Sequence, residues 1–136
     1  MPILKIPGAP VGKGRPRFTR TGHPYTDSKT RDYEELARKL WKIRGLPKTS
    51  GAVAVEITAR FPVQKSCTKT ERAAKLSGKL RPQIKPDADN IAKIILDALN
   101  GLAFDDDKDV IYLRATKEYT DGAGEVVVSV TPFDGG

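Results

Sequence analysis

The chain has 136 residues, of which 38% are hydrophobic and 30% are charged, a composition typical of a soluble globular protein with one modest core. No apolar run approaches the roughly 18–20 residues that span a bilayer, and the basic N-terminal stretch lacks the apolar segment of a signal peptide. The single cysteine, Cys67, excludes an internal disulfide and a thiolate zinc site. We therefore expect one cytoplasmic domain over residues 1–136.

Charge is distributed unevenly along the chain, whose net charge is +7. Residues 1–86 contain 20 Lys and Arg against 6 Asp and Glu, whereas residues 87–136 contain 4 against 11. The basic part predicts a surface that binds a polyanion, most simply nucleic acid. Carboxylates repel phosphates, so the acidic part fits such a protein mainly where a cation neutralises it. The alternative is an acidic, solvated face.

The N-terminal part predicts a strand, a basic segment and a helix. Residues 3–6 predict a short strand. Residues 11–20 combine glycines with Lys and Arg, and such glycines let backbone amides approach a ligand closely. Residues 27–44 carry one apolar stripe and predict a helix that Asp27 or Ser28 caps.

The middle of the chain predicts a strand followed by a polar insert. Residues 52–61 are rich in β-branched side chains and predict the strand. Residues 63–86 are the most polar stretch, in which residues 70–77 predict a short helix. We expect this insert to be mobile and positively charged. The alternative is an ordinary solvated surface helix.

The C-terminal part predicts a helix and two strands. Residues 89–100 carry the most regular apolar stripe, and Gly101 follows where a C′ glycine belongs. Residues 110–119 and 126–130 predict two strands, which a Gly-rich turn would join as a hairpin. The order of elements predicts an α+β fold with a small, mixed, mainly antiparallel sheet, two main helices on one face and the basic insert.

Two acidic clusters flank the predicted helix over residues 89–100. Asp87 and Asp89 lie at its start, and the run Asp105-Asp-Asp-Lys-Asp109 follows its end. A helix of about twelve residues separates its two ends by roughly 18 Å. The clusters therefore meet only if the chain after Gly101 folds back along the helix, which the sequence alone does not determine.

If the clusters meet, their carboxylates form a metal site. Hard oxygen ligands suit Mg²⁺ or Mn²⁺, which can activate water and stabilise both oxygens of an in-line phosphodiester displacement. Lys93, one turn after Asp89, could neutralise charge that develops on the phosphate. Each residue also has a simpler explanation. Asp87 or Asp89 could cap the helix, Lys93 could pair with acids at i±4, and residues 105–109 could be a solvated turn.

The motif around this helix belongs to a longer pattern. It consists of Lys85-Pro-Asp-Ala-Asp-Asn-Ile-Ala-Lys93, then Ile95-Leu-Asp-Ala-Leu-Asn-Gly101, then Phe104-Asp-Asp-Asp-Lys-Asp-Val110, with Gly14-Arg-Pro-Arg17, Tyr25-Thr26 and the helix around Tyr33 upstream. This pattern resembles the RusA family of Holliday-junction resolvases, which occur largely in phages and prophages. The resemblance covers nearly the whole chain.

The resemblance implies a homodimeric, Mg²⁺-dependent endonuclease that cuts four-way DNA junctions with paired symmetric nicks in recombination and repair. The acidic turn of this chain has more carboxylates than the two that the family usually has, so the ligand among Asp105, Asp106 and Asp107 stays open. Counting back from Val110 favours Asp107. The metal ligands that the resemblance implies are Asp87, Asp89, Asp106 and Asp107, and the catalytic residues are Asp87, Asp89, Lys93 and Asp107.

Basic residues outside the acidic half are expected to bind DNA phosphates without reading sequence. The predicted contacts are Lys13, Arg15, Arg17, Arg20 and Lys85, together with the insert over residues 65–85. The expected partners are branched DNA and a second copy of the chain, since a two-fold junction needs two cuts, and the expected cofactor is Mg²⁺ or Mn²⁺. We expect no membrane association and no nucleotide cofactor. Two alternatives stay open: a non-catalytic DNA-binding or architectural module, and a nuclease that prefers flaps or RNA.

Overall fold

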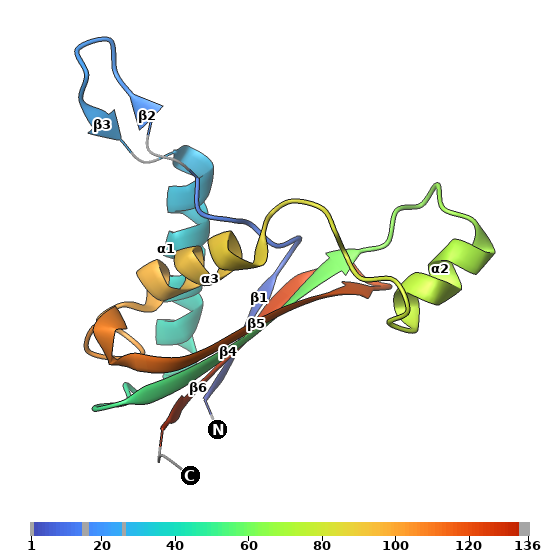
Figure 1. The fold of residues 1–136 in the computed structure, drawn as a ribbon. Coiled ribbons are helices and arrows are strands. Elements are labelled where there is room, and N and C mark those ends of the chain that lie inside the picture. Colours follow the sequence, from blue (N-terminus) through green and yellow to red (C-terminus); the bar gives the residue numbers. More distant parts are fainter. Residues whose placement is uncertain (1, 15–16, 26, 134–136) are drawn as a thin grey trace.

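The computed structural model describes residues 2–14, 17–25 and 27–133 (Figure 1). Within them the chain forms a four-stranded mixed sheet, a two-stranded ribbon and three α-helices. The predicted α+β class and the mixed sheet are confirmed. No helix in this part of the chain is long and apolar enough to cross a membrane.

The main sheet has the strand order β1-β6-β4-β5. Its strands are β1 (Ile3–Pro7), β4 (Val53–Pro62), β5 (Val110–Thr120) and β6 (Glu125–Pro132). The long strand β4 lies in the interior of the sheet, where it pairs antiparallel with β6 and parallel with β5. β1 adds antiparallel to the outer edge of β6.

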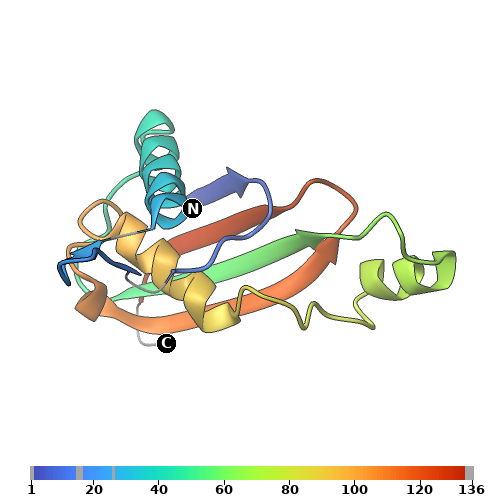
Figure 2. The same cartoon turned by 90° about the horizontal axis from the view of Figure 1, so that it is seen from above.

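The predicted C-terminal hairpin is wrong. β5 and β6 follow one another in the chain, but β4 lies between them, so that Ala54 is the register partner of both Tyr112 and Thr131. The turn around Gly122 therefore passes over the end of β4 instead of joining neighbours (Figure 2). The turn residues show where the chain reverses, but they do not determine which strand pairs with β5. That pairing follows from the burial of β4. β4 buries every second side chain and gains most from neighbours on both edges.

One face of the sheet is covered by α1 (Ser28–Ile43) and α3 (Ala88–Leu99), as the view from above shows (Figure 2). α1 packs against β1, α3 packs against β5, and the two helices contact each other. The alternating residues from Val53 to Phe61 on β4 and from Val126 to Val130 on β6 are buried beneath them. The predicted apolar stripe of the second helix is confirmed by the buried residues of α3, which are Ile91, Ala92, Ile94, Ile95, Ala98 and Leu99.

Two basic elements project beyond this core on different sides of α3 (Figures 1 and 2). The segment over residues 11–20 leads into the ribbon of β2 (Arg17–Phe18) and β3 (Pro24–Tyr25), closed by the Thr19 amide, which donates to the His23 carbonyl at 2.9 Å. These strands were not predicted, because two residues are too few to show alternation. The predicted insert helix is confirmed as α2 (Lys69–Leu76), which has no buried residues.

Replacement of Ile95 tests the assignment of the core face. Ile95 is fully buried, so Ile95→Ala should lower the free energy of unfolding by about 2–5 kcal/mol through lost burial and a residual cavity. Ile43 on α1 is 69% exposed, and Ile43→Ala is the matched control, with an expected change below about 0.5 kcal/mol. Urea unfolding followed by circular dichroism measures both, and equal effects would contradict the assignment.

Candidate functional site

α3 carries charged residues on the face that points away from the core. Asp89, Lys93 and Asp97 follow one another at intervals of four residues, which places them on consecutive turns of the same face. Asp89 and Lys93 are exposed, and Asp97 is half-buried. From the sequence, Asp97 was expected only as an alternative ion-pair partner of Lys93 at i±4, not as a member of the site.

The chain reverses immediately after α3. Gly101 has φ +81°, a conformation that only glycine adopts freely, and its amide donates to the carbonyl of Phe104 at 2.9 Å. Phe104 is fully buried and anchors the return. A single 3₁₀ turn over Asp107–Asp109 follows, and β5 then runs back beneath α3. This path carries the second acidic cluster toward the first.

One pocket of about 290 Å³ lies along the charged face of α3, and one acid of each cluster borders it. Asp89 of α3 and Asp107 of the 3₁₀ turn both border it, so two of the predicted metal ligands share one space. Asp87 and Asp106 are not part of its lining. The lining residues are Asp89, Ala92, Lys93, Leu96 and Asp97 from α3, together with Asp107 and Leu113.

The pocket suits a partly hydrated divalent ion. Among the residues that the structure describes, no three Asp, Glu, His or Cys side chains are close enough to hold a metal ion by themselves. Mg²⁺ usually keeps several waters, however, and binds protein through one or two carboxylates. Asp89 and Asp107 carry carboxylate oxygens of the kind that Mg²⁺ prefers, and the pocket volume exceeds the roughly 30 Å³ that each water occupies in the liquid.

The acids of the turn differ in their surroundings. A hydrogen bond between the carboxyl groups of Asp106 and Asp107 lowers the pKa of Asp106 and raises the pKa of Asp107, and the nearby charge of Asp97 adds to the second effect. Asp105 instead pairs with Lys48 at 3.3 Å. Of the three candidates that the sequence left open, Asp107 is therefore the one that borders the pocket and lies near the charge of Asp97 on α3.

Asp87 occupies the N-cap position of α3, but its carboxylate does not cap the helix. At the start of α1, Asp27 accepts a hydrogen bond from the Lys29 amide at 3.4 Å, and at the start of α2, Thr68 accepts one from the Glu71 amide at 3.1 Å. Asp87 makes no such bond, and its side chain is exposed. The helix-cap explanation of this residue is therefore not realised.

Lys93 is not neutralised by its neighbours on the helix. The ion pairs among the described residues do not include Lys93, so the expected alternative of pairing with Asp89 and Asp97 at i±4 is not realised either. Lys93 borders the same pocket as Asp89, Asp97 and Asp107. One cation is thus placed beside the acids and is available to an anionic ligand.

Lys13, a predicted DNA contact, is held between two helices. Its Nζ lies 2.8 Å from Glu34 Oε2 on α1 and 3.1 Å from Asp97 Oδ2 on α3. Partial burial lowers the pKa of Lys13, but the hydrogen bonds to the two carboxylates outweigh this effect and raise the pKa above its ordinary value. Lys13 is therefore bound to a carboxylate that borders the pocket. Nothing in the sequence singled out Glu34 for this contact.

The structure describes the side chains of two other predicted DNA contacts, Arg20 and Lys85, and neither of them lines the pocket. Arg20 is exposed in the loop of the ribbon. Lys85 is exposed just before α3 and borders a separate hollow of about 270 Å³, together with Gly12 and Lys29. Arg15 lies outside the described residues, as does the side chain of Arg17.

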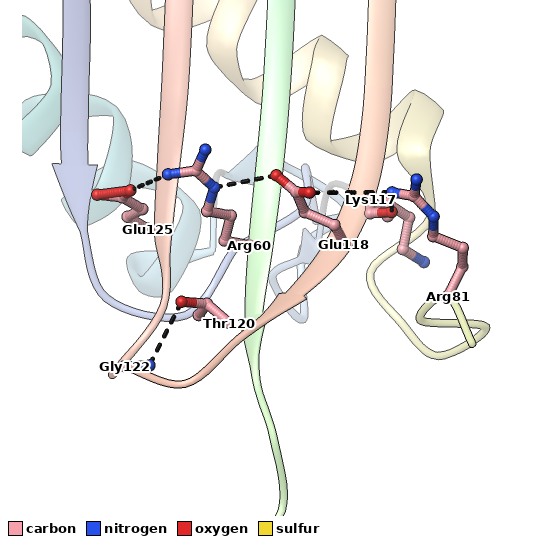
Figure 3. A network of polar contacts seen from close by, with 7 residues as sticks. All are labelled: Arg60, Arg81, Lys117, Glu118, Thr120, Gly122 and Glu125. Atoms are coloured by element: carbon pink, nitrogen blue, oxygen red, sulfur yellow. Dashed lines mark hydrogen bonds and ion pairs between the residues drawn. The ribbon is translucent and has the colours of Figure 1, made fainter. Parts of the chain in front are cut away.

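The basic insert is attached to the end of the sheet by polar contacts (Figure 3). The Arg81 guanidinium donates to the Lys117 carbonyl at 3.3 Å, and the Lys117 ammonium donates to the Ile84 carbonyl at 2.5 Å. Arg81 also lies 4.0 Å from Glu118, whose second oxygen accepts from Arg60 at 3.0 Å. These contacts hold the insert on β5 while leaving exposed lysines on it, namely Lys65, Lys69, Lys79 and Lys85.

A larger hollow of about 580 Å³ lies along one face of α2 and the residues that follow it. Lys69 and Lys79 border it, and no carboxylate does. It lacks the acids that would hold a metal ion, so it has the chemistry of an anion-binding surface and not of a metal centre.

Replacement of Gly12 tests how closely the basic segment packs against α3. A Cβ atom at Gly12 would lie 2.7 Å from Pro86 Cβ and 3.1 Å from Asn90 Cβ. Gly12→Ala should therefore lower the free energy of unfolding by about 1–3 kcal/mol. Gly122→Ala is the control, because its nearest neighbouring atom would be 4.0 Å away, and its effect should stay within about 0.5 kcal/mol. Urea unfolding measures both; a Gly12→Ala protein of wild-type stability would disprove the close packing.

Comparison with known proteins places these elements in a family. The chain matches the family model described as Endodeoxyribonuclease RusA over residues 7–131. It is 36% identical over 123 residues to the uncharacterized protein YqaN of Bacillus subtilis strain 168, an alignment that covers 84% of each chain. The family match includes the basic segment, the insert, α3 and both acidic clusters, so the resemblance identified from the sequence motifs is confirmed.

Proposed function

Because the chain belongs to the RusA family of endodeoxyribonucleases, we propose that it is a Mg²⁺-dependent endonuclease that resolves four-way DNA junctions. The observation that supports this function is the pocket in which Asp89 and Lys93 of α3 meet Asp107 of the following turn. Carboxylates that hold a divalent ion beside a free lysine are the groups that phosphodiester hydrolysis employs. The proposed products carry 5′-phosphate and 3′-hydroxyl ends.

Each residue of the site has a proposed role. Asp89 and Asp107 are the ligands of the divalent ion, and Asp87 and Asp106, which flank them in the chain, complete the set. When bound, the ion would activate water and offset the charge of the scissile phosphate. Lys93 binds the phosphate and neutralises the negative charge that develops on it. The other residues of the chain hold these groups in place and bind the DNA.

The proposed DNA-binding surface uses the two basic projections. The ribbon with Arg20 and the insert with its exposed lysines extend on different sides of α3 (Figures 1 and 2), and we propose that the DNA contacts both of them and α3 between them. Arg15, Arg17 and Lys85 are the further proposed phosphate contacts. A four-way junction has two-fold symmetry and needs one cut in each of two strands, so the proposed active form is a homodimer.

Two substitutions in the pocket test the nuclease. Asp89→Asn and Asp107→Asn should each lower the cleavage rate of a labelled four-way junction at least about a hundredfold, because each removes ligand charge. Junction affinity should be unchanged or improved, since the basic surface is intact. Asp105→Asn is the matched control from the same turn, where Asp105 pairs with Lys48 outside the pocket, and this variant should cut normally. An Asp107→Asn protein that cuts at the wild-type rate would overturn the site.

The substrate panel separates the proposed function from its alternatives. Labelled four-way junction, flap, plain duplex and single-stranded RNA are incubated with Mg²⁺ and, in parallel, with EDTA. Cleavage of the junction in Mg²⁺ alone, at symmetric positions in two strands, is expected. Binding without cleavage would indicate a DNA-binding module, and faster cleavage of flaps or RNA would assign another substrate.

The salt dependence of junction binding tests the role of the insert. Each phosphate contact contributes about −0.9 to the slope of log K against log salt concentration. Replacement of both Lys69 and Lys79 with Ala should weaken binding in EDTA and reduce the magnitude of the slope by about 2, since two contacts are lost. Lys39→Ala, on the exposed side of α1, is the control and should leave the slope unchanged. Fluorescence anisotropy measures both variants. An unaltered slope in the insert variant would contradict the proposed phosphate contacts of Lys69 and Lys79.

A further inference from the structure

We propose that Lys13 is a positioning residue for cleavage: fixed by Glu34, it holds Asp97 at the edge of the pocket and does not contact a DNA phosphate. This inference rests on the proposed nuclease function, because it assigns a role in the same site. It replaces the expectation, based on charge alone, that Lys13 belongs to the DNA-binding surface.

The first support is the way in which the backbone around Lys13 is fixed. The Lys13 amide donates to the Asn90 carbonyl in α3 at 3.0 Å, and the Gly14 amide donates to Thr30 Oγ1 in α1 at 3.0 Å. Thr30 is itself buried, and a Cβ atom at Gly14 would lie only 2.9 Å from its hydroxyl oxygen. The segment is thus attached to both helices at adjacent residues, and the side chain between these two contacts reaches the gap between α1 and α3.

The second support is the ion pair itself. Only 23% of the Lys13 side chain is exposed, and Glu34 is more buried still, at 15%. Charge-assisted hydrogen bonds of 2.8 and 3.1 Å occupy the ammonium group from two sides. A DNA phosphate would have to displace two carboxylates that are already in place, whereas the exposed Arg20 takes part in none of the ion pairs among the described residues.

The third support is the position of Asp97. Its Oδ2 accepts from Lys13, while the residue borders the pocket that Asp89, Lys93 and Asp107 also border. Lys13 therefore restricts the orientation of this carboxylate and offsets part of the negative charge that Asp97 adds next to Asp107. Glu34 does not border the pocket, so its role is to keep Lys13 in place.

The test compares Lys13→Met, which keeps the aliphatic stem, with Arg20→Ala as the matched control from the same basic segment. For Lys13→Met we expect single-turnover junction cleavage in Mg²⁺ to slow at least about tenfold. Junction affinity in EDTA should stay within about twofold of wild type, with an unchanged salt slope. Arg20→Ala should show the opposite pattern, with weaker binding and a slope reduced by about 0.9. A Lys13→Met protein that follows the Arg20→Ala pattern, or that cuts at the wild-type rate, overturns the proposal.

Coupling to Asp97 separates positioning from general support of the fold. In an Asp97→Asn background, Lys13→Met should cause little further loss of rate, because the group through which it acts is already altered. Lys13→Arg, which keeps a charged donor, should recover part of the rate at unchanged stability. Fully multiplicative rate losses, or no recovery with Arg, contradict the proposal.

Two controls keep the outcome interpretable. Urea unfolding is measured for each variant, and if Lys13→Met does not fold, Glu34→Gln takes its place, with an expected loss of rate of about threefold at unchanged junction affinity. A Glu34→Gln protein of wild-type rate then overturns the proposal. Failure of the wild-type protein to cut any junction in Mg²⁺ or Mn²⁺ counts against the proposed function alone, since the salt slope of Lys13→Met still tests whether Lys13 binds phosphate.

Discussion

The burial of one face of α3 against the sheet is the interaction on which the candidate site depends. Six residues of this helix are buried, and each large aliphatic side chain among them contributes about 1.5–3 kcal/mol relative to exposure. Rotation of the helix about its axis would expose this stripe, so the orientation of the opposite face is fixed as well. Asp89, Lys93 and Asp97 lie on that face. The same constraint determines where the chain can turn after Gly101, and so brings Asp107 beside them. The chemistry of the pocket is therefore a consequence of core packing.

Acidic and basic side chains gather in different parts of the protein. Acids gather at the pocket, while exposed cations lie on the ribbon and the insert, which project beyond the helices that cover the sheet (Figure 1). Carboxylates in the path of a DNA strand raise the free energy of binding unless cations offset them. Lys48 beside Asp105 and Lys13 beside Asp97 supply such an offset from within the protein, and Lys93 is left for the ligand. Under the proposed function, a pocket whose carboxylates repel DNA phosphates therefore belongs to a protein that binds DNA through its periphery.

Local sequence patterns predicted most helices and strands of this protein. They did not predict which residues from distant parts of the chain contact one another. The stripe of α3, its terminal glycine and the short insert helix all follow from periodicity, because their signals lie within a few residues. The partner of β5 does not, because the turn around Gly122 is compatible with a hairpin and with a crossing over β4. Counting back from Val110 favoured Asp107 among the acids of the turn, but only their neighbours in space separate them, since Asp105 pairs with Lys48 whereas Asp107 borders the pocket. The link between Lys13, Glu34 and Asp97 joins three elements, and no spacing in the sequence encodes it.

The place of β6 in the sheet also constrains the order in which the protein can assemble. β6 comes last in the chain, yet it is the strand that connects β1, which comes first, to the pair of β4 and β5. Without β6 the sheet would consist of two unconnected parts, and the apolar faces of α1 and α3 would have only an incomplete surface to cover. Pairing between segments that are far apart in the chain also carries the entropy of closing a long loop, which slows folding. The surface beneath both helices is therefore complete only when β6 joins β1 to β4.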